Sequence, residues 1–496
     1  MSTIIEKKRW PLALIIIAAV VVASVAIALS YRSTPGRIPV QAISGGSGGA
    51  IIAWENEKGI YAQRIDSSGQ PQWQAGGIFI CECPPTRNFD LTPDGMGGAI
   101  ITWNDRSNIP DDRDDPAYFD PVPFYSQRIS FSGELLWGDG IIATGTAGLY
   151  GVEFPRVVAG GTGGAIFVWN NYKTYYKALH DDFLRLQKIA SDGRRLWSDE
   201  GVLLVASFPY RPLTEEEIAR GIKGTITRSR PTYEGENDIV SDGAGGVIVF
   251  WEEETEYDGQ KVYAQRLDGE GNPVWPDRVV AGVGSYYDET AKSDGAGGAA
   301  LAFTSEETGV TYLQHISGNG ELLETEVYSA NTVNDGLGGT IQVRVEAEPF
   351  SGPPWEKSSI LYVQRLGEEG QPLWPEKQVL ATAERQQLHE LVFTADGTGG
   401  VILAWQLRKE YVAYGGLFAQ RLDAEGNICW GEEGLPVFTA PDIKYQGGAV
   451  ILSDDSGGVL IIAAAGKSAL SGDMVYVQKL DTAGNRLWGG GIRIDR

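Results

Sequence analysis

One phrase of amino acids recurs eight times along the chain, and it constrains the fold more than any other feature. Its most legible copy reads DGAGGVIVFW at 242–251, followed by VYAQRLDGEGNPVW at 262–275. The copies are marked by Gly-Gly pairs that begin at Gly48, Gly97, Gly163, Gly245, Gly297, Gly338, Gly399 and Gly457. Self-similarity at such a period is the signature of a repeat architecture.

A single copy, residues 235–281, predicts four short strands. NDIV (237–240) is followed by a Gly-rich turn and by GVIVFW, whose β-branched and aromatic residues favour a strand. VYAQRLD predicts the third strand, and PVWPDRVVA, after a second tight turn, predicts the fourth. Four antiparallel strands in roughly 40–50 residues make a unit the size of a propeller blade.

The chain is therefore predicted to be all-β: an eight-bladed β-propeller of four-stranded antiparallel blades over residues 38–496. One blade cannot bury its apolar faces alone, so neighbouring blades must cover them. A linear β-solenoid is the competing geometry, although its coils do not need two tight hairpins per repeat. We find no spare strand at either end that would have to cross over to close the ring.

The aromatic and amide residues of the repeat are predicted to be structural. Five Trp end the second predicted strand and seven open the fourth, so we expect them to form the core between blades. The Gln of the third strand recurs in every copy, which predicts a structural hydrogen bond rather than an active site. These residues are Gln63, Gln127, Gln187, Gln265, Gln314, Gln364, Gln420 and Gln478.

The N-terminus predicts a membrane helix before the propeller. Residues 11–29 carry no charge and follow Lys7, Lys8 and Arg9. This length approaches the roughly 20 residues that span a bilayer, and the basic residues place the N-terminus in the cytoplasm. We expect a cytoplasmic segment at 1–10, an uncleaved signal anchor at 11–30, a linker at 31–37 and an extracytoplasmic propeller. The alternative is a cleaved signal peptide, which small residues at Ala26 and Ala28 permit.

The net charge bears on the kind of binding partner, and the cysteine spacing bears on disulfide formation. The net charge of −24, with no basic run beyond the N-terminus, argues against nucleic acid as a partner. Cys81 and Cys83 lie two residues apart on one side of a predicted strand, a poor geometry for a mutual disulfide. With Cys429 far away in the seventh repeat, we expect free thiols.

Insertions occur only between the second and third strands or between blades, so antiparallel topology predicts that all of them emerge on one face. They cover 104–124, 170–183, 208–237 and 346–359, and a capping-box pattern at Thr214 and Glu217 predicts a short helix at 214–222. Insertions on repeats commonly map to the binding face. We expect an off-centre patch over blades 2–4, with tolerated surface decoration as the alternative.

The insertions hold the candidate site residues. Aromatic side chains suited to protein or glycan contact are Tyr118, Phe119, Tyr172, Tyr175, Tyr176, Tyr210 and Trp355. Acidic residues that offer oxygen ligands to Ca²⁺ are Asp111, Asp112, Asp114, Asp115 and Asp120. Their spacing does not match an EF-hand loop, and a solvated acidic loop is the alternative. No other cofactor is predicted.

No catalytic motif stands out. The chain has three His, and a hydrolytic triad needs one of them as a base. His315 takes the place of the repeat's Arg in the fifth copy, whereas His180 and His389 stand alone. Paired carboxylates have no motif around them.

YAQRLDGEGNPVW (263–275) and FAQRLDAEGNICW (418–430) resemble the A-x-D-x-x-x-G-x-x-x-W docking motif of quinoprotein-like eight-bladed propellers, with Ala264, Gly271 and Trp275 at matching positions and Asp268 nearby. The resemblance implies the fold and the number of blades. That superfamily includes quinone-dependent dehydrogenases, which use adjacent cysteines and a Ca²⁺ site, and non-enzymatic envelope assembly factors. This chain has Cys-Glu-Cys at 81–83 instead.

The sequence favours a membrane-anchored, extracytoplasmic binding or scaffold module for a protein or envelope component. The alternatives are a propeller enzyme, glycan-active or quinone-dependent, with a site in the central channel, and a structural role at the cell surface.

Overall fold

The computed structural model describes residues 39–82, 89–105, 124–142, 151–161, 163–176, 179–207, 237–255, 259–286, 291–305, 311–327, 332–337, 339–347, 359–367, 371–375, 378–383, 387–409, 413–441, 443, 445–454, 456–466 and 474–495. Within these ranges the regular structure consists of strands. No helix in them is both long enough and apolar enough to cross a membrane. The predicted anchor at 11–30 and the predicted helix at 214–222 lie outside these ranges.

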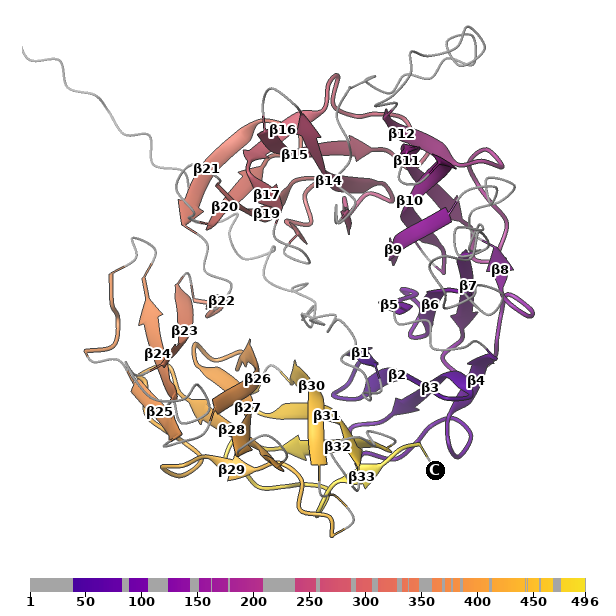
Figure 1. The fold of residues 1–496 in the computed structure, drawn as a ribbon. Coiled ribbons are helices and arrows are strands. Elements are labelled where there is room, and N and C mark those ends of the chain that lie inside the picture. Colours follow the sequence, from indigo (N-terminus) through magenta and orange to yellow (C-terminus); the bar gives the residue numbers. More distant parts are fainter. Residues whose placement is uncertain are drawn as a thin grey trace, which may run out of the picture.

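The strands form eight antiparallel sheets, one for each copy of the repeat (Figure 1). Blade 1 contains β1 (Val40–Ser44), β2 (Ala50–Asn56), β3 (Gly59–Ile65) and β4 (Ile78–Cys81). Blade 2 contains β5 (Phe89–Pro93), β6 (Ala99–Asn104), β7 (Phe124–Ile129) and β8 (Ile141–Ile142). Blade 3 contains β9 (Gly151–Ala159), β10 (Ala165–Tyr176), β11 (Leu179–Ile189) and β12 (Val202–Ser207). Blade 4 contains β13 (Asp238–Ser241), β14 (Val247–Thr255), β15 (Gly259–Leu267) and β16 (Val279–Val283).

The second half of the ring repeats this order. Blade 5 contains β17 (Ser285–Tyr286), β18 (Lys292–Ser293), β19 (Ala299–Thr304), β20 (Thr311–Ile316) and β21 (Leu322–Val327). Blade 6 contains β22 (Thr332–Asn334), β23 (Thr340–Ala347), β24 (Ser359–Leu366) and β25 (Gln378–Ala383). Blade 7 contains β26 (Gln387–Ala395), β27 (Val401–Lys409), β28 (Ala413–Leu422) and β29 (Leu435–Pro436). Blade 8 contains β30 (Tyr445–Ser453), β31 (Val459–Gly466), β32 (Met474–Leu480) and β33 (Ile492–Arg493).

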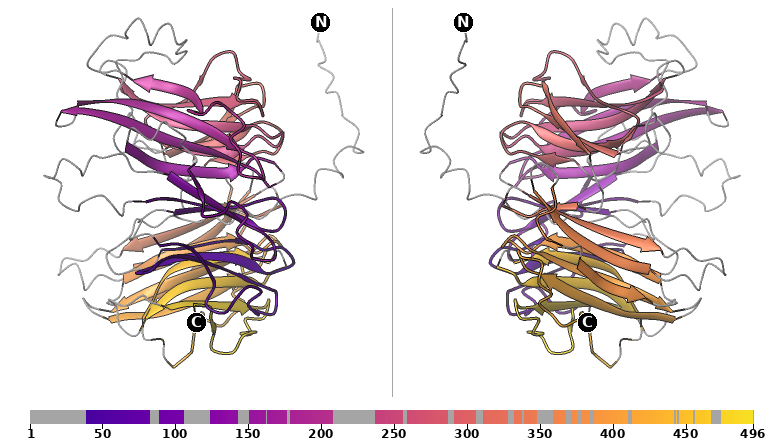
Figure 2. Two further views of the ribbon diagram at one scale, coloured as in Figure 1. Left: turned by 90° about the vertical axis from the view of Figure 1, so that its right-hand side faces the viewer. Right: turned by 90° about the vertical axis from the view of Figure 1, so that its left-hand side faces the viewer.

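The sheets are arranged radially around a central axis, which confirms the predicted eight-bladed propeller (Figure 1). The first strand of each blade lies nearest the axis and the fourth lies at the rim. Figure 2 shows the resulting disc from two sides. Each sheet is built from consecutive strands, so no strand crosses between blades 8 and 1 in the described part of the chain. These two blades are joined instead by an apolar cluster that includes Trp54 and Ile462.

The Asp-Gly turn folds as its sequence predicts. In blade 4 the Asp242 carboxylate accepts backbone N–H groups of Ala244 and Gly246 at 2.8 and 2.7 Å. Gly243 and Gly245 have φ of 76° and 89°, a region that favours glycine. At Gly246 a Cβ atom would come within 2.2 Å of the carbonyl oxygen of Leu267, so only glycine lets the two strands approach.

The predicted fourth strands begin too early. Trp275 lies before β16 and Trp73 lies before β4, not inside them. After a single bridge, such as that between Leu267 and Pro273, the chain leaves the sheet and passes through Trp275 before it resumes pairing at Val279. This excursion lets the indole leave its own sheet and reach the next blade.

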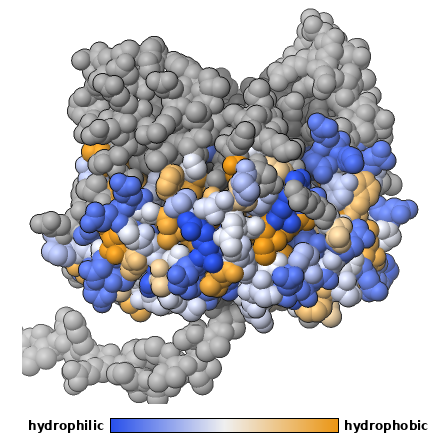
Figure 3. Space-filling view, turned by 90° about the horizontal axis from the view of Figure 1, so that it is seen from below, coloured by the Kyte–Doolittle hydropathy of each residue, from blue (hydrophilic) through white to orange (hydrophobic). Residues whose placement is uncertain are grey.

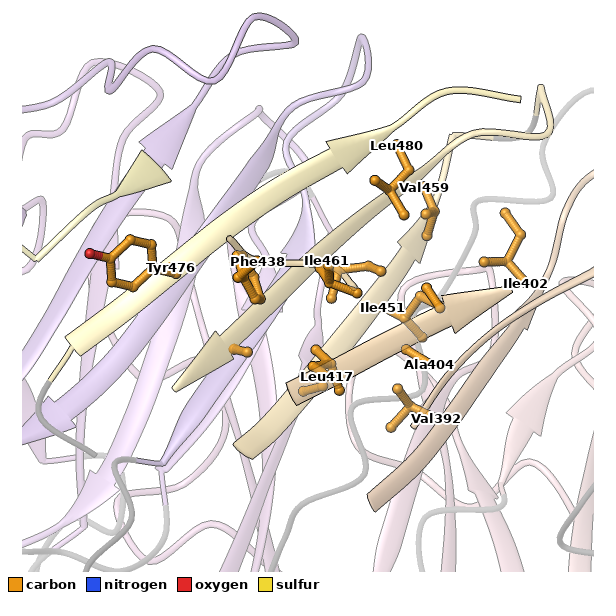
Figure 4. Close-up of a cluster of buried hydrophobic side chains, with 14 of the residues drawn as sticks. Val392, Ile402, Ala404, Leu417, Phe438, Ile451, Val459, Ile461, Tyr476 and Leu480 are labelled. Atoms are coloured by element: carbon orange, nitrogen blue, oxygen red, sulfur yellow. The ribbon is translucent and has the colours of Figure 1, made fainter. Parts of the chain in front are cut away.

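Apolar clusters fill the spaces between neighbouring blades. Alternate residues of each second strand face opposite neighbours, because side chains of a strand alternate between its two faces. In blade 7, for example, Trp405 packs toward blade 6 and Ala404 toward blade 8. Figure 4 shows the cluster between blades 7 and 8, in which Ile402 and Leu417 of one meet Ile451 and Ile461 of the other.

A Trp-mediated contact also connects blades. In six blades the indole N–H of the Trp before the fourth strand donates to a backbone carbonyl in the next blade's second tight turn. The pairs are Trp73 with Phe131, Trp137 with Ser191, Trp197 with Gly269, Trp275 with Gly318, Trp374 with Ala424, and Trp430 with Thr482. We call each such pair a Trp latch. The prediction that these Trp are core is confirmed.

The repeated Gln has a structural role inside its own blade. In blade 1 the Gln63 amide donates to the carbonyl oxygen of Gln74 at 2.9 Å. Its oxygen accepts the backbone N–H groups of Arg64 and Trp73 at 2.9 and 3.0 Å. Because these bonds tie the excursion around Trp73 to the third strand, the Gln fixes the position of the latch. The sequence-based interpretation of this residue is confirmed.

The expectation of free thiols is correct for Cys429 and wrong for Cys81. Cys429 is a free thiol, and burial raises its pKa. Cys81 is disulfide-bonded, and the chain's remaining cysteine, Cys83, lies outside the described residues. The argument against a bridge assumed a continuing strand. Cys81 is instead the last residue of β4.

Candidate functional site

The two faces of the disc differ as the antiparallel topology predicts. The Asp-Gly turns and the second tight turns lie on one face, which we call the tight-turn face. The ends of second and fourth strands lie on the opposite face, which we call the loop face. Every insertion predicted from the sequence begins there, for instance between the end of β6 at Asn104 and the start of β7 at Phe124. Figure 3 views the disc from its rim, where apolar residues are scattered among polar ones.

Most candidate site residues lie outside the described part of the chain. This applies to the aromatic residues Tyr118, Phe119, Tyr210 and Trp355, and to the acidic residues Asp111, Asp112, Asp114, Asp115 and Asp120. The interface and Ca²⁺ hypotheses for them stay predictions. Within the described residues no group of three or more His, Cys, Asp or Glu is placed to hold a metal ion.

The insertion in blade 3 continues the sheet instead of forming a separate loop. β10 and β11 pair from Ala165 with Ile189 out to Tyr176 with Leu179, and a β-bulge interrupts the register near Thr174. The predicted residues Tyr172, Tyr175 and Tyr176 therefore belong to β10. The inner strand β9 extends with them, pairing Gly151 with Tyr172. The outer strand β12 extends as well, pairing Ser207 with Asp182, and beyond these pairs β10 and β11 continue alone as a two-stranded ribbon. We call this part of the sheet on the loop face the blade 3 extension.

Polar side chains occupy one equivalent position of the innermost strand in four consecutive blades. They are Gln41, Asp90, Arg156 and Asp238, each half-buried, and we call them the axial arc. The Gln41 amide donates to the carbonyl oxygen of Phe89 in blade 2 at 2.7 Å. Asp90 accepts the backbone N–H of Val157 in blade 3 at 3.2 Å.

Those two bonds run from one blade to the free edge of the next, so the axial arc satisfies backbone groups that the innermost strands would otherwise expose to the channel. At the corresponding position blades 7 and 8 have Val392 and Val450, which are buried. The axial lining is therefore polar over blades 1–4 and apolar over blades 7 and 8.

A hydrogen-bonded group connects blade 4 to blade 5 at the loop face. The buried Glu252 carboxylate accepts the Gln260 amide at 2.6 Å, and the Gln260 oxygen accepts the Ser285 hydroxyl at 2.7 Å. On the other face of the same strand, Glu253 accepts the Trp251 indole N–H and forms an ion pair with Arg278. A buried carboxylate needs polar partners, and Glu252 has the Gln260 amide while Glu253 has the Trp251 indole and Arg278. We interpret both Glu as structural.

Lys292 places a cation inside the ring next to the axial arc. It belongs to β18, the innermost strand of blade 5, and its side chain is accessible to solvent. Partial desolvation among the surrounding strands lowers its pKa. The half of the ring nearest blades 1–5 thus offers amide, carboxylate, guanidinium and ammonium groups. Such a set is suited to binding a polar partner by hydrogen bonds and charge.

Sequence reasoning missed the axial arc. Its signal was present, because each member stands four residues before the first residue of the Asp-Gly turn or its Gly-Gly counterpart. Four polar residues at that position in consecutive copies were obscured by the variable residues around them.

The chain matches no family model and no curated protein sequence. Among solved structures it is similar to dipeptidyl peptidase 4 from Porphyromonas gingivalis, with 10% identity, a TM-score of 0.45 and coverage of 94% of this chain. The chain spans 60% of the length of that peptidase. It is also similar to an α-L-arabinofuranosidase from Fusarium graminearum, with 11% identity, a TM-score of 0.34 and coverage of 81% of this chain and 93% of that one.

A third similar structure is the β-propeller domain of the trilobed protease from Pyrococcus furiosus, which has an open velcro topology. Its identity is 10% and its TM-score 0.31, with coverage of 69% of this chain and 97% of that one. Likeness at these levels concerns the propeller fold alone. The chain itself is an eight-bladed β-propeller of four-stranded antiparallel blades. The quinoprotein-like resemblance stays a prediction beyond that.

Proposed function

We propose that this protein is a membrane-anchored, extracytoplasmic binding module without catalytic activity. In this proposal the loop face over blades 2–4 holds another protein or a component of the cell envelope. The apolar segment 11–30 serves as the tether, with the propeller outside the cytoplasm. The docking-type motif at Ala264, Gly271 and Trp275 supports kinship with quinoprotein-like propellers, a superfamily that includes non-enzymatic envelope assembly factors.

The observation that carries the proposal is the coincidence of two asymmetries on one half of the ring. The blade 3 extension adds paired strands beyond the length that a blade needs for its own core. The axial arc makes the channel polar on the same side, across blades 1–4. A repeat needs neither feature for stability, because blades 7 and 8 pack without a polar residue at the arc position. Loops and extensions on a rigid scaffold are where binding residues concentrate.

The charge of the chain fits the same function. A net charge of −24 on an extracytoplasmic module favours a neutral or basic partner surface and repels polyanions such as nucleic acid. Blades 2–4 also contribute the insertions at 104–124 and 208–237, which flank the blade 3 extension in sequence. The partner would therefore contact several segments at once, which is typical of specific protein interfaces.

The test removes the blade 3 extension and leaves its blade intact. Residues 172–182 are replaced by Asn-Gly, a sequence that favours a two-residue hairpin turn, so that Asn171 and Phe183 flank the turn. The native protein and this variant are purified from membranes, and co-purifying proteins and glycans are identified by mass spectrometry. We expect the variant to fold, to stay on membranes and to lose the partner.

The matched control shortens the end of the hairpin in blade 7. β27 and β28 pair from Val401 with Leu422 out to Lys409 with Ala413 on the opposite side of the ring. Replacing residues 409–413 by Asn-Gly should leave the partner bound. Partner recovery that is equal for both variants would refute the assignment to blades 2–4. Release of the native protein by high salt or carbonate alone would refute the anchor at 11–30.

A further inference from the structure

The eight blades are joined by only seven apolar clusters within the described residues. The clusters lie between blades 1 and 2, 2 and 3, 3 and 4, 4 and 5, 6 and 7, 7 and 8, and 8 and 1. Blades 5 and 6 have no such cluster among these residues, and we call their interface the seam. In Figure 1 the ribbons of β20 and β21 stand apart from those of β22–β25, whereas the other neighbours adjoin.

Blade 5 lacks the Trp latch. Glu324 stands where other blades carry the latching Trp, ten residues after the repeated Gln. In other blades the Trp at this position is buried: Trp275 of blade 4 and Trp374 of blade 6 are 1% and 2% exposed. The Gln that positions the latch is still present, because Gln314 donates to the carbonyl oxygen of Leu323 at 3.0 Å. The repeated Gln therefore still bonds the fourth strand, at the residue before the latch position, while the docking indole is absent.

Blade 5 also lacks the Arg or Lys that follows the repeated Gln in the other seven blades. In blades 2, 4, 6 and 7 an Arg binds the turn Asp of its own blade and donates to the same carbonyl as the Trp latch. Arg266, for example, contacts Asp242 at 3.0 Å and the carbonyl oxygen of Gly318 at 3.0 Å. His315 occupies this position in blade 5, with a shorter side chain.

Blade 6 presents a polar face toward blade 5. The residues of second strands that face the preceding blade are apolar elsewhere, as in Val401, Leu403 and Trp405 of blade 7. Blade 6 has Thr340, Gln342 and Arg344 at these positions. The first two are half-buried and Arg344 is exposed, whereas Ile341 and Val343, which face blade 7, are fully buried.

Among the described residues, blades 5 and 6 therefore lack the apolar cluster that joins every other pair of neighbouring blades. We propose that the propeller ring opens and closes at the seam between blades 5 and 6, and that blades 6-7-8-1-2-3-4-5 form one continuous arc. The end-to-end interface between blades 8 and 1 is packed like the internal ones, since Gly69 of blade 1 lies against the Trp488 ring of blade 8. The opening lies in the interior of the chain and not at its ends.

Two equivalent positions on the rim permit a direct test. Leu323 and Leu373 precede the latch position in blades 5 and 6, and Leu136 and Leu196 do so in blades 2 and 3; all four are exposed. Spin labels are attached to L323C/L373C and to L136C/L196C, both in a C429S background that leaves no other free thiol among the described residues. We expect a broad or two-peaked distance distribution across the seam and a narrow one for the control pair. Equal widths would overturn the proposal.

Amide hydrogen exchange tests the unlabelled protein. Backbone amides of β19, β20 and β23 should exchange about tenfold faster or more than those of β27 and β31, because opening exposes them without global unfolding. The variant E324W/H315R restores the latch residues of blade 5 and should slow this exchange. The matched control L323W places the same indole one residue away and should not. Uniform exchange in all blades, or equal slowing by both variants, would overturn the proposal.

Discussion

Trp275 of blade 4 donates its indole N–H to the carbonyl oxygen of Gly318 in blade 5, at 3.0 Å. The ring of Trp275 also lies against Gly320, where a Cβ atom would come within 2.9 Å of it. One large side chain thus combines apolar burial, a hydrogen bond and a shape match that only glycine allows. The same arrangement links most neighbouring blades, so the ring is held together mainly by what each blade offers to the next.

Removing a latch should destabilise the fold strongly. Trp430 is 4% exposed in the cluster between blades 7 and 8 and donates to the carbonyl oxygen of Thr482 at 3.0 Å. Trp430→Ala should lower the free energy of unfolding by about 3–5 kcal/mol, as is usual for a buried large aromatic residue. Glu324→Ala, at the equivalent position of blade 5, removes no indole and should change it by less than about 1 kcal/mol. Urea denaturation followed by Trp fluorescence measures both, and similar losses would contradict the latch.

Two glycines of blade 7 separate the effect of space from that of backbone strain. Gly426 and Gly431 have φ of 87° and 81°. A Cβ atom at Gly426 would come within 2.8 Å of the Trp374 ring, whereas one at Gly431 would meet nothing within 4 Å. Gly431→Ala should cost about 1 kcal/mol from the positive φ alone, and Gly426→Ala clearly more, because overpacking typically adds about 1–3 kcal/mol. Thermal unfolding would refute this ranking if Gly431→Ala were the worse variant.

Replacing the buried Asp396 of blade 7 by Asn should destabilise the fold less than replacing it by Ala. The Asp396 carboxylate accepts backbone N–H groups of Thr398 and Gly400 at 2.7 and 2.8 Å and pairs with Arg421 at 2.8 Å. Asp396→Ala removes the turn bonds and leaves the Arg421 guanidinium without its carboxylate, which typically costs about 3–5 kcal/mol. Asp396→Asn keeps an oxygen for the turn and should cost less. Equal midpoints of denaturation for the two variants would contradict this role.

The turn carboxylates predict a decline of stability in acid. Burial acts to raise the pKa of Asp335, but the Leu337 N–H, the Arg365 side chain and the Gly339 N–H together hold that pKa below its ordinary value. At Asp481 the Asn485 side chain is the main cause of a lowered pKa. Because the unfolded chain takes up these protons first, the stabilisation is complete above the unfolded pKa of about 4 and is lost as pH falls through the lower folded pKa.

We therefore expect the melting temperature to change little between about pH 7 and pH 5 and to fall below about pH 4. Asp335→Asn should be less stable at neutral pH and show a shallower decline in acid. Thermal scans from neutral to acid pH measure this dependence. A melting temperature that rises as the pH is lowered below the unfolded pKa would contradict this role of the turn carboxylates.

The repeat predicted the blades well because each copy carries its own folding signals. The turn Asp and Gly of DGAGG and the apolar run after them suffice to form a hairpin around Gly246, and eight copies suffice for a ring. The position of Trp275 was missed because its indole belongs to the next blade. No local pattern shows that the chain leaves the sheet there.

The candidate site was less predictable. The axial arc depends on contacts such as that between Asp90 and Val157, which are far apart in the sequence and meet only when two blades adjoin. The departures at Glu324 and His315 were visible as single substitutions. They indicate a weak interface only together with the structural finding that Thr340 and Gln342 of blade 6 face blade 5 across the seam.

The most direct test of the proposed function is a hydrogen-exchange comparison of the free protein with the native complex recovered from membranes. Our account predicts slower exchange on complex formation in β10, β11 and the loop-face end of β14, and unchanged exchange in β27, β31 and the tight-turn face. Protection confined to blades 6–8 or to the tight-turn face would contradict it.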